Sequence, residues 1–326
     1  MTFNREQFIS SLFRLHSEQD FNDLALKSFH YQFEYNTVYK KFADILGTDI
    51  NNINHYSKIP FLPIELYKSH RIISGDAAYE RLFLSSGTTS ENRSGLYVKD
   101  TALYGTCFIK AFQLFFGNPS AYHILALLPG YNEESSLVYM VAKLIQLSNS
   151  RLSGFYIGKN DKLAEVIRKS SDRKIILFGV SHALLDFSEN FNMALPDLIV
   201  IETGGMKGRR KEMIREEVHD IIKKSFGVSG VYSEYGMTEL FSQAYSNSDG
   251  NFHCPPWMKV LTRDVNDPLS LPAPGRTGGI NIIDLANIDS CSFIATADLG
   301  KVNLDGSFEI IGRLDNSDLR GCNLMI

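Results

Sequence analysis

The chain has few cysteines, no long apolar run and no excess of positive charge, and each absence excludes a class of protein. Its four cysteines, spread over 326 residues, form no C-x-x-C pair. This argues against a disulfide framework and against a structural zinc site. His253 and Cys254 are the single adjacent His/Cys pair, and we interpret them as part of a strand edge rather than as metal ligands.

The formal net charge of −4 gives no reason to expect a groove for nucleic acid. The one basic run, Lys207–Lys211, would open an amphipathic helix, so a solvated helix face explains it. No stretch approaches the ~18 apolar residues of a membrane span, and the first residues contain no apolar signal core. We therefore expect a cytoplasmic protein with no nucleic-acid partner and no membrane span.

With 44% hydrophobic residues, the chain is long enough to bury a large core. From residue 101 onward, short runs rich in Ile, Val and Leu alternate with segments of helical periodicity. We expect helices at 101–116, 135–147, 162–169, from 182 onward and at 208–224, and strands at 123–128, 152–157, 174–178, 197–201 and 228–233. This alternation is typical of an α/β fold with a mostly parallel sheet that is buried on both faces.

The two ends of the chain have other patterns. Apolar residues recur at helical spacing from residue 3 to about residue 47, whereas past residue 251 short strands are separated by Pro, Gly, Asn and Asp. These strands are expected at 258–261, 279–283, 293–296 and 308–311. The sequence thus predicts three successive parts: a helical N-terminal segment packed on the core (1–80), an α/β core (81–250) and a small β-rich subdomain (251–326).

A cluster of hydroxyl groups follows the apolar run at 82–84. This hydroxyl loop surrounds Gly87 and consists of Ser85, Ser86, Thr88, Thr89 and Ser90. Hydroxyls can donate to an oxyanion and a glycine lets the backbone approach it, while Arg93 adds a cation just past the loop. The loop has neither the G-K-[ST] of a Walker loop nor the glycine spacing of a dinucleotide fingerprint. We interpret it as a polyphosphate-binding loop, and a solvated turn is the alternative.

A second polar cluster, from Glu234 to Glu239, follows the strand expected to end near residue 233. Tyr235 and Gly236 can hold an aromatic base, and Thr238 can donate to a phosphate. Glu239 can hold Mg²⁺ if phosphate oxygens complete the coordination shell. The alternative is a strand-to-helix turn with Glu239 in the first turn of the helix, where a carboxylate is favoured in any case.

Three more clusters follow expected strands. Glu202-Thr203-Gly204-Gly205 comes after the strand at 197–201, and Thr296-Ala297-Asp298 ends a strand with an aspartate that can bind a ribose diol. Gly312-Arg313-Leu314-Asp315 comes after the last expected strand. Each cluster alone fits a turn. Ligands of open α/β sheets bind beyond the carboxyl ends of the strands, so the ordered set favours a nucleotide site.

Taken together, these motifs resemble those of the adenylate-forming enzymes, a group that includes acyl-CoA synthetases, luciferase and adenylation domains. Ser86–Thr89 match the S-G-T-T of their phosphate loop, and Ser90, Asn92 and Arg93 replace its Gly, Pro and Lys. The family's Y-G-x-T-E is matched by Tyr235, Gly236, Thr238 and Glu239, and its G-R-x-D by Gly312, Arg313 and Asp315. Its T-G-D becomes Thr296, Ala297 and Asp298, and Gly204 and Gly205 resemble its adenine-side glycines.

Within this group the chain is most similar to the acyl-protein synthetase family, the LuxE type of the bacterial luminescence fatty-acid reductase. The similarity rests on residues 59–64, 202–207 and 320–324. It implies the adenylate-forming large-domain fold, with mostly parallel sheets flanked by helices and a β-rich C-terminal subdomain. It also implies that no C-terminal lid domain follows, because such proteins stop soon after G-R-x-D.

The resemblance implies ATP and Mg²⁺ as cofactors, and a carboxylic acid, expected to be a fatty acid, as substrate. The acid would form an acyl-adenylate, and the acyl group would pass to a thiol of an acyl-accepting protein. The implied nucleotide-binding residues are Ser85, Ser86, Gly87, Thr88, Thr89, Ser90, Gly204, Gly205, Tyr235, Gly236, Asp298 and Arg313. The implied catalytic residues are Thr238, Glu239, Arg93, His182 and Cys322, with Glu239 as the metal ligand.

Alternatives stay open at two residues and for the function. His182 either faces the acyl carboxylate or makes a structural hydrogen bond at a helix N-terminus. Cys322 either carries the acyl group or is a small buried apolar residue. The runner-up functions are an acyl- or aryl-CoA or carrier-protein ligase of the phenylacetate-CoA ligase type and a nucleotide-binding partner subunit without turnover. A serine hydrolase is disfavoured because the sequence has no G-x-S-x-G elbow.

Overall fold

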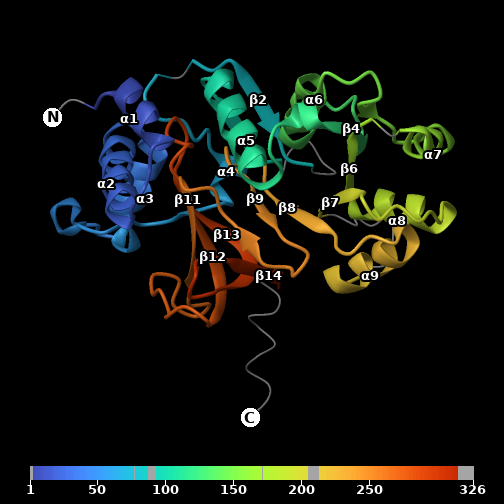
Figure 1. Ribbon diagram of the computed structural model, residues 1–326. Coiled ribbons are helices and arrows are strands. Elements are labelled where there is room, and N and C mark those ends of the chain that lie inside the picture. Colours follow the sequence, from blue (N-terminus) through green and yellow to red (C-terminus); the bar gives the residue numbers. More distant parts are fainter. Residues whose placement is uncertain (1–2, 77, 87–92, 171, 205–212, 315–326) are drawn as a thin grey trace, which may run out of the picture. The chain divides into compact units, whose positions relative to one another are not determined.

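The computed structural model describes residues 3–76, 78–86, 93–170, 172–204 and 213–314 (Figure 1). Residue contacts divide the chain into two compact units. The first unit consists of residues 1–104, 238–242 and 253–326, and the second of residues 105–237 and 243–252. The division into three successive parts that we expect from the sequence stays a prediction. In the structure, residue contacts assign the N-terminal and C-terminal parts of the chain to the same unit.

The second unit is built on a sheet of mainly parallel strands in the order β5-β4-β6-β7-β8-β9. Pairing is parallel from β5 to β8, and β9 is antiparallel to β8. Consecutive residues of β4, β6 and β7 are buried, as expected for strands that are covered on both faces. The strands are β4 (Tyr122–Leu127), β5 (Gly154–Phe155), β6 (Lys174–Val180), β7 (Ile199–Thr203), β8 (Tyr232–Tyr235) and β9 (Ala244–Ser246).

Helices alternate with these strands, as the sequence predicts. Ser135 caps α6 by accepting a hydrogen bond from the backbone N–H of Val138 at 3.3 Å. The last helix, α9, ends at Gly227, whose φ of +66° is the left-handed conformation that favours glycine, and α8 lies beside α9 (Figure 1). The helices are α5 (Thr101–Phe116), which begins in the first unit, α6 (Ser136–Ser148), α7 (Asn160–Lys169), α8 (Ser181–Asn190) and α9 (Arg215–Phe226), with a short 3₁₀ turn at Pro119–Ala121.

The predicted elements of this unit are confirmed in kind, but several bounds were wrong. The strands β7 and β8 extend to Thr203 and Tyr235, beyond the ends at 201 and 233 that the apolar runs indicated. The reason is that ladder pairing continues past the apolar residues, with Thr203 opposite Glu234. The helix expected from residue 208 is found from Arg215 onward, and residues 205–212 lie outside the described part of the chain.

The first unit contains the N-terminal helices that the sequence predicts. The start of α2 is fixed by a capping box, in which Ser17 Oγ accepts from the Asp20 N–H at 3.1 Å and the Asp20 carboxylate accepts from the Ser17 N–H at 3.0 Å. The helices are α1 (Arg5–Leu12), α2 (Glu18–Tyr35), α3 (Thr37–Ile45) and α4 (Leu66–Ser69), with 3₁₀ turns at Ile50–Asn52 and Tyr56–Lys58. None of the helices in the described residues is long and apolar enough to cross a membrane.

The C-terminal strands of the first unit form an antiparallel sheet in the order β11-β12-β13-β14, and β1 runs parallel to β13. A separate antiparallel hairpin is formed by β2 and β3. The pair His253-Cys254 stands at a strand, as predicted, because β10 ends at His253. The strands are β1 (Leu62–Pro63), β2 (Arg81–Leu84), β3 (Gly95–Val98), β10 (Phe252–His253), which begins in the second unit, β11 (Met258–Arg263), β12 (Thr277–Asp284), β13 (Phe293–Val302) and β14 (Phe308–Arg313).

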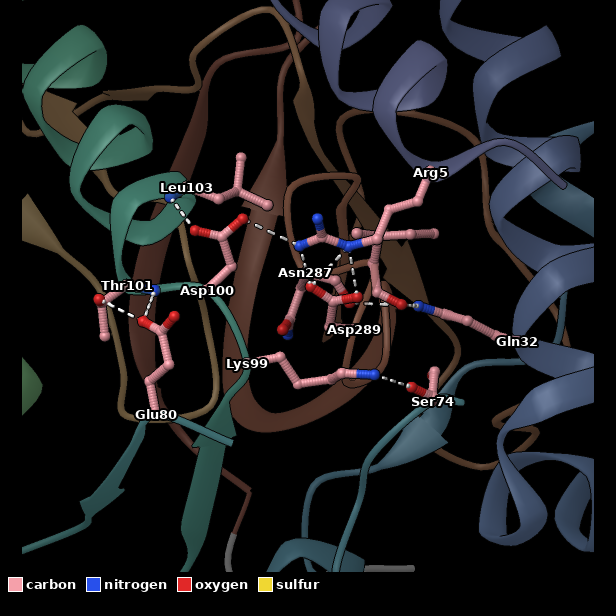
Figure 2. A network of polar contacts seen from close by, with 11 residues as sticks. Arg5, Gln32, Ser74, Glu80, Lys99, Asp100, Thr101, Leu103, Asn287 and Asp289 are labelled. Carbon is pink, nitrogen blue, oxygen red and sulfur yellow. Dashed lines mark hydrogen bonds and ion pairs between the residues drawn. The ribbon is translucent and has the colours of Figure 1, made fainter. Parts of the chain in front are cut away.

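The β12–β13 connection, taken together with Asp284 at the end of β12 (residues 284–292), lies in the interior of the first unit although it is rich in polar residues. Figure 2 shows how the N-terminal helices bind it: Arg5 Nη2 lies 2.5 Å from Asp289 Oδ2 and 3.2 Å from Asp100 Oδ2, and Gln32 donates to the Asn287 carbonyl at 3.1 Å. The polar residues of the connection that are at most 1% exposed are Asp284, Asn287, Asp289, Ser290 and Ser292.

Candidate functional site

Two buried carboxylates stand on neighbouring strands of the second unit, at the carboxyl ends of β7 and β8. Glu202 lies opposite Ser233, and Thr203 lies opposite Glu234. The apolar pattern of the sequence predicts both glutamates in polar clusters beyond the strands and indicates no role for them. In the structure both glutamates belong to the strands themselves. The signal that could have marked them in the sequence is an acidic residue at the end of each of two apolar strands.

Glu202 is surrounded by hydrogen-bond donors. Ser181 Oγ donates to Oε1, Ser233 Oγ donates to Oε2 at 3.2 Å, and His219 Nε2 lies 3.9 Å from Oε2. Burial by itself raises the pKa of this carboxyl, but the hydrogen bonds from His219 and Ser181 and the charge of Arg215 outweigh burial, so the pKa lies below its usual value. Glu202 is therefore an anion at neutral pH.

Glu234 is the opposite case. Burial, together with the nearby charge of Glu202, raises the pKa of its carboxyl to about 7, against a hydrogen bond from Thr203 Oγ1 that lowers it. That hydrogen bond joins Thr203 Oγ1 to Glu234 Oε2 at 2.8 Å. At neutral pH Glu202 is thus ionised and Glu234 is only partly ionised, because several donors bind the first carboxyl and one binds the second.

Three of the predicted nucleotide-binding residues of this unit are described. Tyr235 is the last residue of β8, and its largely buried ring lies 5.7 Å from the ring of Phe252. Gly204 and Gly236 are exposed just past the ends of β7 and β8. A Cβ on Gly236 would collide with Glu234 Oε1, whereas a Cβ on Gly204 meets no described atom within 4 Å. The predicted residue Gly205 lies outside the described residues.

These glycines give a test that needs no ligand. We expect Gly236→Ala to lower the free energy of unfolding by about 1–3 kcal/mol, the usual cost of overpacking, because its Cβ would displace the Glu234 carboxyl and lie 3.2 Å from Gln243 Cγ. Gly204→Ala is the matched control and should leave stability within ~0.5 kcal/mol. Urea unfolding of both variants measures the difference, and equal losses would contradict the role of the Glu234 contact.

The predicted catalytic residue His182 lies in the first turn of α8, directly after β6, and is buried. Its neighbour Ser181 is the residue that donates to Glu202. His182 is therefore the sequence neighbour of a residue that binds Glu202, and it follows the carboxyl end of the parallel strand β6.

Glu239 belongs to the first unit and is 5% exposed. Burial raises the pKa of its carboxyl, opposed by a hydrogen bond from Ser94 and by the charges of Lys68 and Arg313. Thr238 is half-buried beside it. Both residues lie in a turn, and no helix begins there, so the alternative that placed Glu239 in the first turn of a helix is wrong.

The base of the hydroxyl loop is held by the hairpin β2–β3. Leu84 pairs with Gly95, the Ser85 N–H donates to the Ser94 carbonyl at 2.9 Å, and the Ser94 N–H donates to Ser85 Oγ at 2.9 Å. Arg93 Nε donates to the Ser85 carbonyl at 2.6 Å, and Ser86 is exposed. The predicted residues Gly87, Thr88, Thr89 and Ser90 lie outside the described residues, as does Cys322.

Asp298 and Arg313 face each other across β13 and β14, with Arg313 Nε 3.8 Å from Asp298 Oδ1 and the Arg313 side chain 76% exposed. The sequence placed Asp298 at the end of a strand, and this was wrong because β13 runs on to Val302. It placed Arg313 just after a strand, whereas Arg313 is the last residue of β14. Cross-strand pairing carries these strands through polar residues that an apolar pattern does not mark.

One residue near Asp298 has no counterpart in the sequence analysis. Arg263 is largely buried, and its guanidinium donates to the carbonyls of Ile280 at 2.7 Å and Thr296 at 2.5 Å. A Cβ on Gly279 would lie 2.6 Å from the Arg263 guanidinium carbon, so the glycine makes room for it. Arg263 thus fixes the backbone that leads to Asp298, and nothing in the local sequence pattern marks it.

Among the described residues, no group of three or more His, Cys, Asp or Glu side chains could hold a metal ion. A divalent cation at Glu239 would therefore take most of its ligands from elsewhere. Mg²⁺ is commonly bound in this way, by one or two carboxylates together with phosphate oxygens and water.

No protein-family model matches the chain, and no curated protein matches it in sequence. Solved structures match it in fold. ATP-bound MatB from Rhodopseudomonas palustris is 18% identical, with a TM-score of 0.53 over 71% of this chain and 47% of that one. The chain has the large-domain fold of the adenylate-forming enzymes. It spans about half the length of MatB.

A second ligase shares this fold over more of the chain. 2-Hydroxyisobutyryl-CoA ligase in an open conformation, in complex with 2-HIB-AMP and CoA, is 13% identical, with a TM-score of 0.67 over 92% of this chain and 70% of that one. The same ligase in the postadenylation state with R3-HIB-AMP gives a TM-score of 0.69 at 12% identity, over 92% and 68% of the two chains. The predicted α/β fold with parallel strands, flanking helices and a β-rich C-terminal part is confirmed.

Proposed function

We propose that this protein activates a carboxylic acid with ATP and then transfers the acyl group to a thiol. The observation that carries the proposal is the ordered set of adenylate-forming motifs on a chain that has the adenylate-forming fold. In the first step a carboxylate oxygen bonds to the α-phosphorus of ATP, and the bond from that phosphorus to the pyrophosphate oxygen breaks. In the second step a thiolate sulfur bonds to the acyl carbon and AMP leaves.

The first step needs no protein nucleophile, so the side chains of this protein act by binding and orienting the reactants. We propose that the hydroxyl loop and Arg93 bind the β- and γ-phosphates and that Thr238 contacts the α-phosphate. Asp298 and Arg313 would bind the ribose, and their pairing across two strands gives them a fixed spacing. On the adenine side the proposed residues are Tyr235, Gly204, Gly205 and Gly236.

Glu239 is the residue that would hold Mg²⁺. Its carboxyl is buried, is hydrogen-bonded by Ser94, and has a raised pKa; a cation there would stabilise its ionised form. Mg²⁺ bound at this position supplies charge neutralisation to the transferring phosphate. Glu239 would then set the position of the cation, and its Ser94 contact would set the rotamer of Glu239.

The finer proposal concerns the acid and the acceptor. On the resemblance to acyl-protein synthetases we propose a fatty acid as substrate, His182 as a contact of its carboxylate, and Cys322 as the thiol that receives the acyl group. Coenzyme A is the second candidate acceptor, because 2-hydroxyisobutyryl-CoA ligase was solved with CoA and shares the fold. In that case the thioester would leave the protein with CoA.

The test is ATP–pyrophosphate exchange with a panel of carboxylic acids, followed by mass spectrometry of the protein for a covalent acyl adduct. We expect acid-dependent exchange, greatest with fatty acids, and an adduct on Cys322 that Cys322→Ser abolishes while exchange persists. Cys254→Ser is the matched control, because burial raises the pKa of the Cys254 thiol to about 12 and keeps it protonated. Label that appears on added CoA instead would identify the second acceptor, and absence of exchange with every acid would refute the proposed activity.

A further inference from the structure

The segment 239–242 carries the proposed metal ligand on a buried backbone without regular structure. Glu239, Leu240, Phe241 and Ser242 are all buried, and they lie in no helix or strand. Buried backbone N–H and carbonyl groups must find hydrogen-bond partners, because an unpaired one costs ~1–3 kcal/mol. The partners of this segment therefore show what determines the position of Glu239.

Those partners come from the β12–β13 connection. Asp284 Oδ2 accepts from the backbone N–H groups of Phe241 at 2.8 Å and Ser242 at 2.9 Å, and Asp284 Oδ1 accepts from Ser242 Oγ at 2.7 Å. Asn287 Nδ2 donates to the carbonyl of Glu239 itself at 2.8 Å. Two side chains of one connection thus bind the segment on both sides of Leu240.

The Asp284 carboxyl is costly to bury and is satisfied mainly by this segment. It is 0% exposed, and burial raises its pKa against the hydrogen bonds from Ser242, Phe241 and Ala286. Trp257 Nε1 donates to Ser242 Oγ at 2.9 Å, which leaves the hydroxyl proton of Ser242 for Asp284. A buried carboxylate is stable where several donors converge on it, so the segment and Asp284 hold each other in one geometry.

The connection is itself anchored, so it can act as a fixed support. Asp289 binds Arg5 (Figure 2). The Ser292 N–H donates to Gln32 Oε1 at 2.9 Å, and Gln32 Nε2 donates to the carbonyl of Asn287 at 3.1 Å. The backbone of Glu239 therefore rests on side chains whose own conformations are set by packing and by hydrogen bonds to α1 and α2.

We infer that Asp284 and Asn287 are positioning residues for the metal-binding carboxylate of Glu239, an inference that rests on the proposed function. They touch neither the substrate nor the metal and act through the backbone that carries Glu239. Ligand-orienting side chains one step away from a metal change metal affinity or activity by about 10–100-fold when removed, and a catalytic group must stay within ~0.5 Å of its productive position. Replacement of either residue should therefore have a larger effect on the Mg²⁺ concentration needed for activity than on the stability of the fold.

The test compares Asp284→Asn and Asn287→Ala with Ser290→Ala. The last variant removes a buried side chain from the same connection that binds the carbonyl of Ile72 and not the segment 239–242. We measure ATP–pyrophosphate exchange against Mg²⁺ concentration, with thermal unfolding of each variant. The Mg²⁺ concentration for half-maximal exchange should rise about 10–100-fold in Asp284→Asn and Asn287→Ala and stay unchanged in Ser290→Ala.

The outcomes distinguish failure of the proposed function from failure of the positioning role. If the wild-type protein shows no exchange with any acid, the proposed function fails and the inference falls with it. If the wild type is active but both folded variants keep its Mg²⁺ response, or Ser290→Ala shifts it equally, the positioning role alone is overturned. If Asp284→Asn does not fold, the Mg²⁺ response of Asn287→Ala decides whether the positioning role holds. This substitution removes the one hydrogen bond from the Asn287 carboxamide to the segment 239–242 and leaves Asp284 in place.

Discussion

Glu239→Gln is expected to reduce ATP–pyrophosphate exchange by at least about a hundredfold, the usual effect of removing one electrostatic contact to the reacting phosphates. The amide keeps the size of the side chain and its approach to Ser94 but removes the negative charge that would hold Mg²⁺. Higher Mg²⁺ concentrations should restore part of the rate, because the proposed defect lies in cation binding. Exchange kinetics at several Mg²⁺ concentrations measure both effects.

The control is Glu217→Gln, at an exposed position in the first turn of α9. It makes the same chemical change and should leave exchange unaltered. Full activity of Glu239→Gln would remove Glu239 from the proposed site. Loss of activity that no Mg²⁺ concentration restores, in a protein that unfolds at the same temperature as the wild type, would leave Glu239 essential and exclude its role as a metal ligand.

Glu234→Gln is expected to change how stability depends on pH. Burial raises the pKa of the Glu234 carboxyl from 4.5 to about 7 in the folded protein. The folded state therefore binds more protons than the unfolded state between pH 4.5 and 7, and the free energy of unfolding falls as pH rises through that window. The loss amounts to about 3 kcal/mol, and it is complete above pH 7. Glutamine carries no titrating proton, so the variant should not show this loss.

The measurement is urea unfolding of the wild type and Glu234→Gln at pH 5, 6, 7 and 8. The difference in free energy of unfolding should move in favour of the variant by about 3 kcal/mol from pH 5 to pH 8. Taking this difference removes the pH dependence that the two proteins share. Parallel pH profiles for the two proteins would mean that Glu234 titrates normally in the folded state.

The sequence predicted the site residues by motif, and it could not predict what surrounds them. The Tyr235–Glu239 motif is continuous in the chain, yet Tyr235 belongs to the second unit and Glu239 to the first. The contacts that set the backbone of Glu239 come from Asp284 and Asn287, more than 40 residues away. Local patterns contain no information on such pairs, because their hydrogen bonds form only when the β12–β13 connection is folded into the interior.

The same limit applies to charge. Glu202 and Glu234 are identical residues at matching strand ends, and the sequence gives no reason to assign them different protonation states. The structure does, because Glu202 receives hydrogen bonds from Ser181 and Ser233, whereas Glu234 receives one from Thr203. Protonation follows the number of donors and the distance between the two carboxyls, and both are properties of the folded sheet.

By itself, the sequence determined the alternation of helices and strands, the short strands of the C-terminal part and the order of the motifs. These follow from hydrophobic periodicity and residue type, which act over a few neighbouring residues. Only the tertiary structure decided where the strands end, how Arg263 supports the backbone before Asp298, and which side chains hold Glu239. Those features depend on pairing and burial between distant segments, and such interactions come into existence only when the chain has folded.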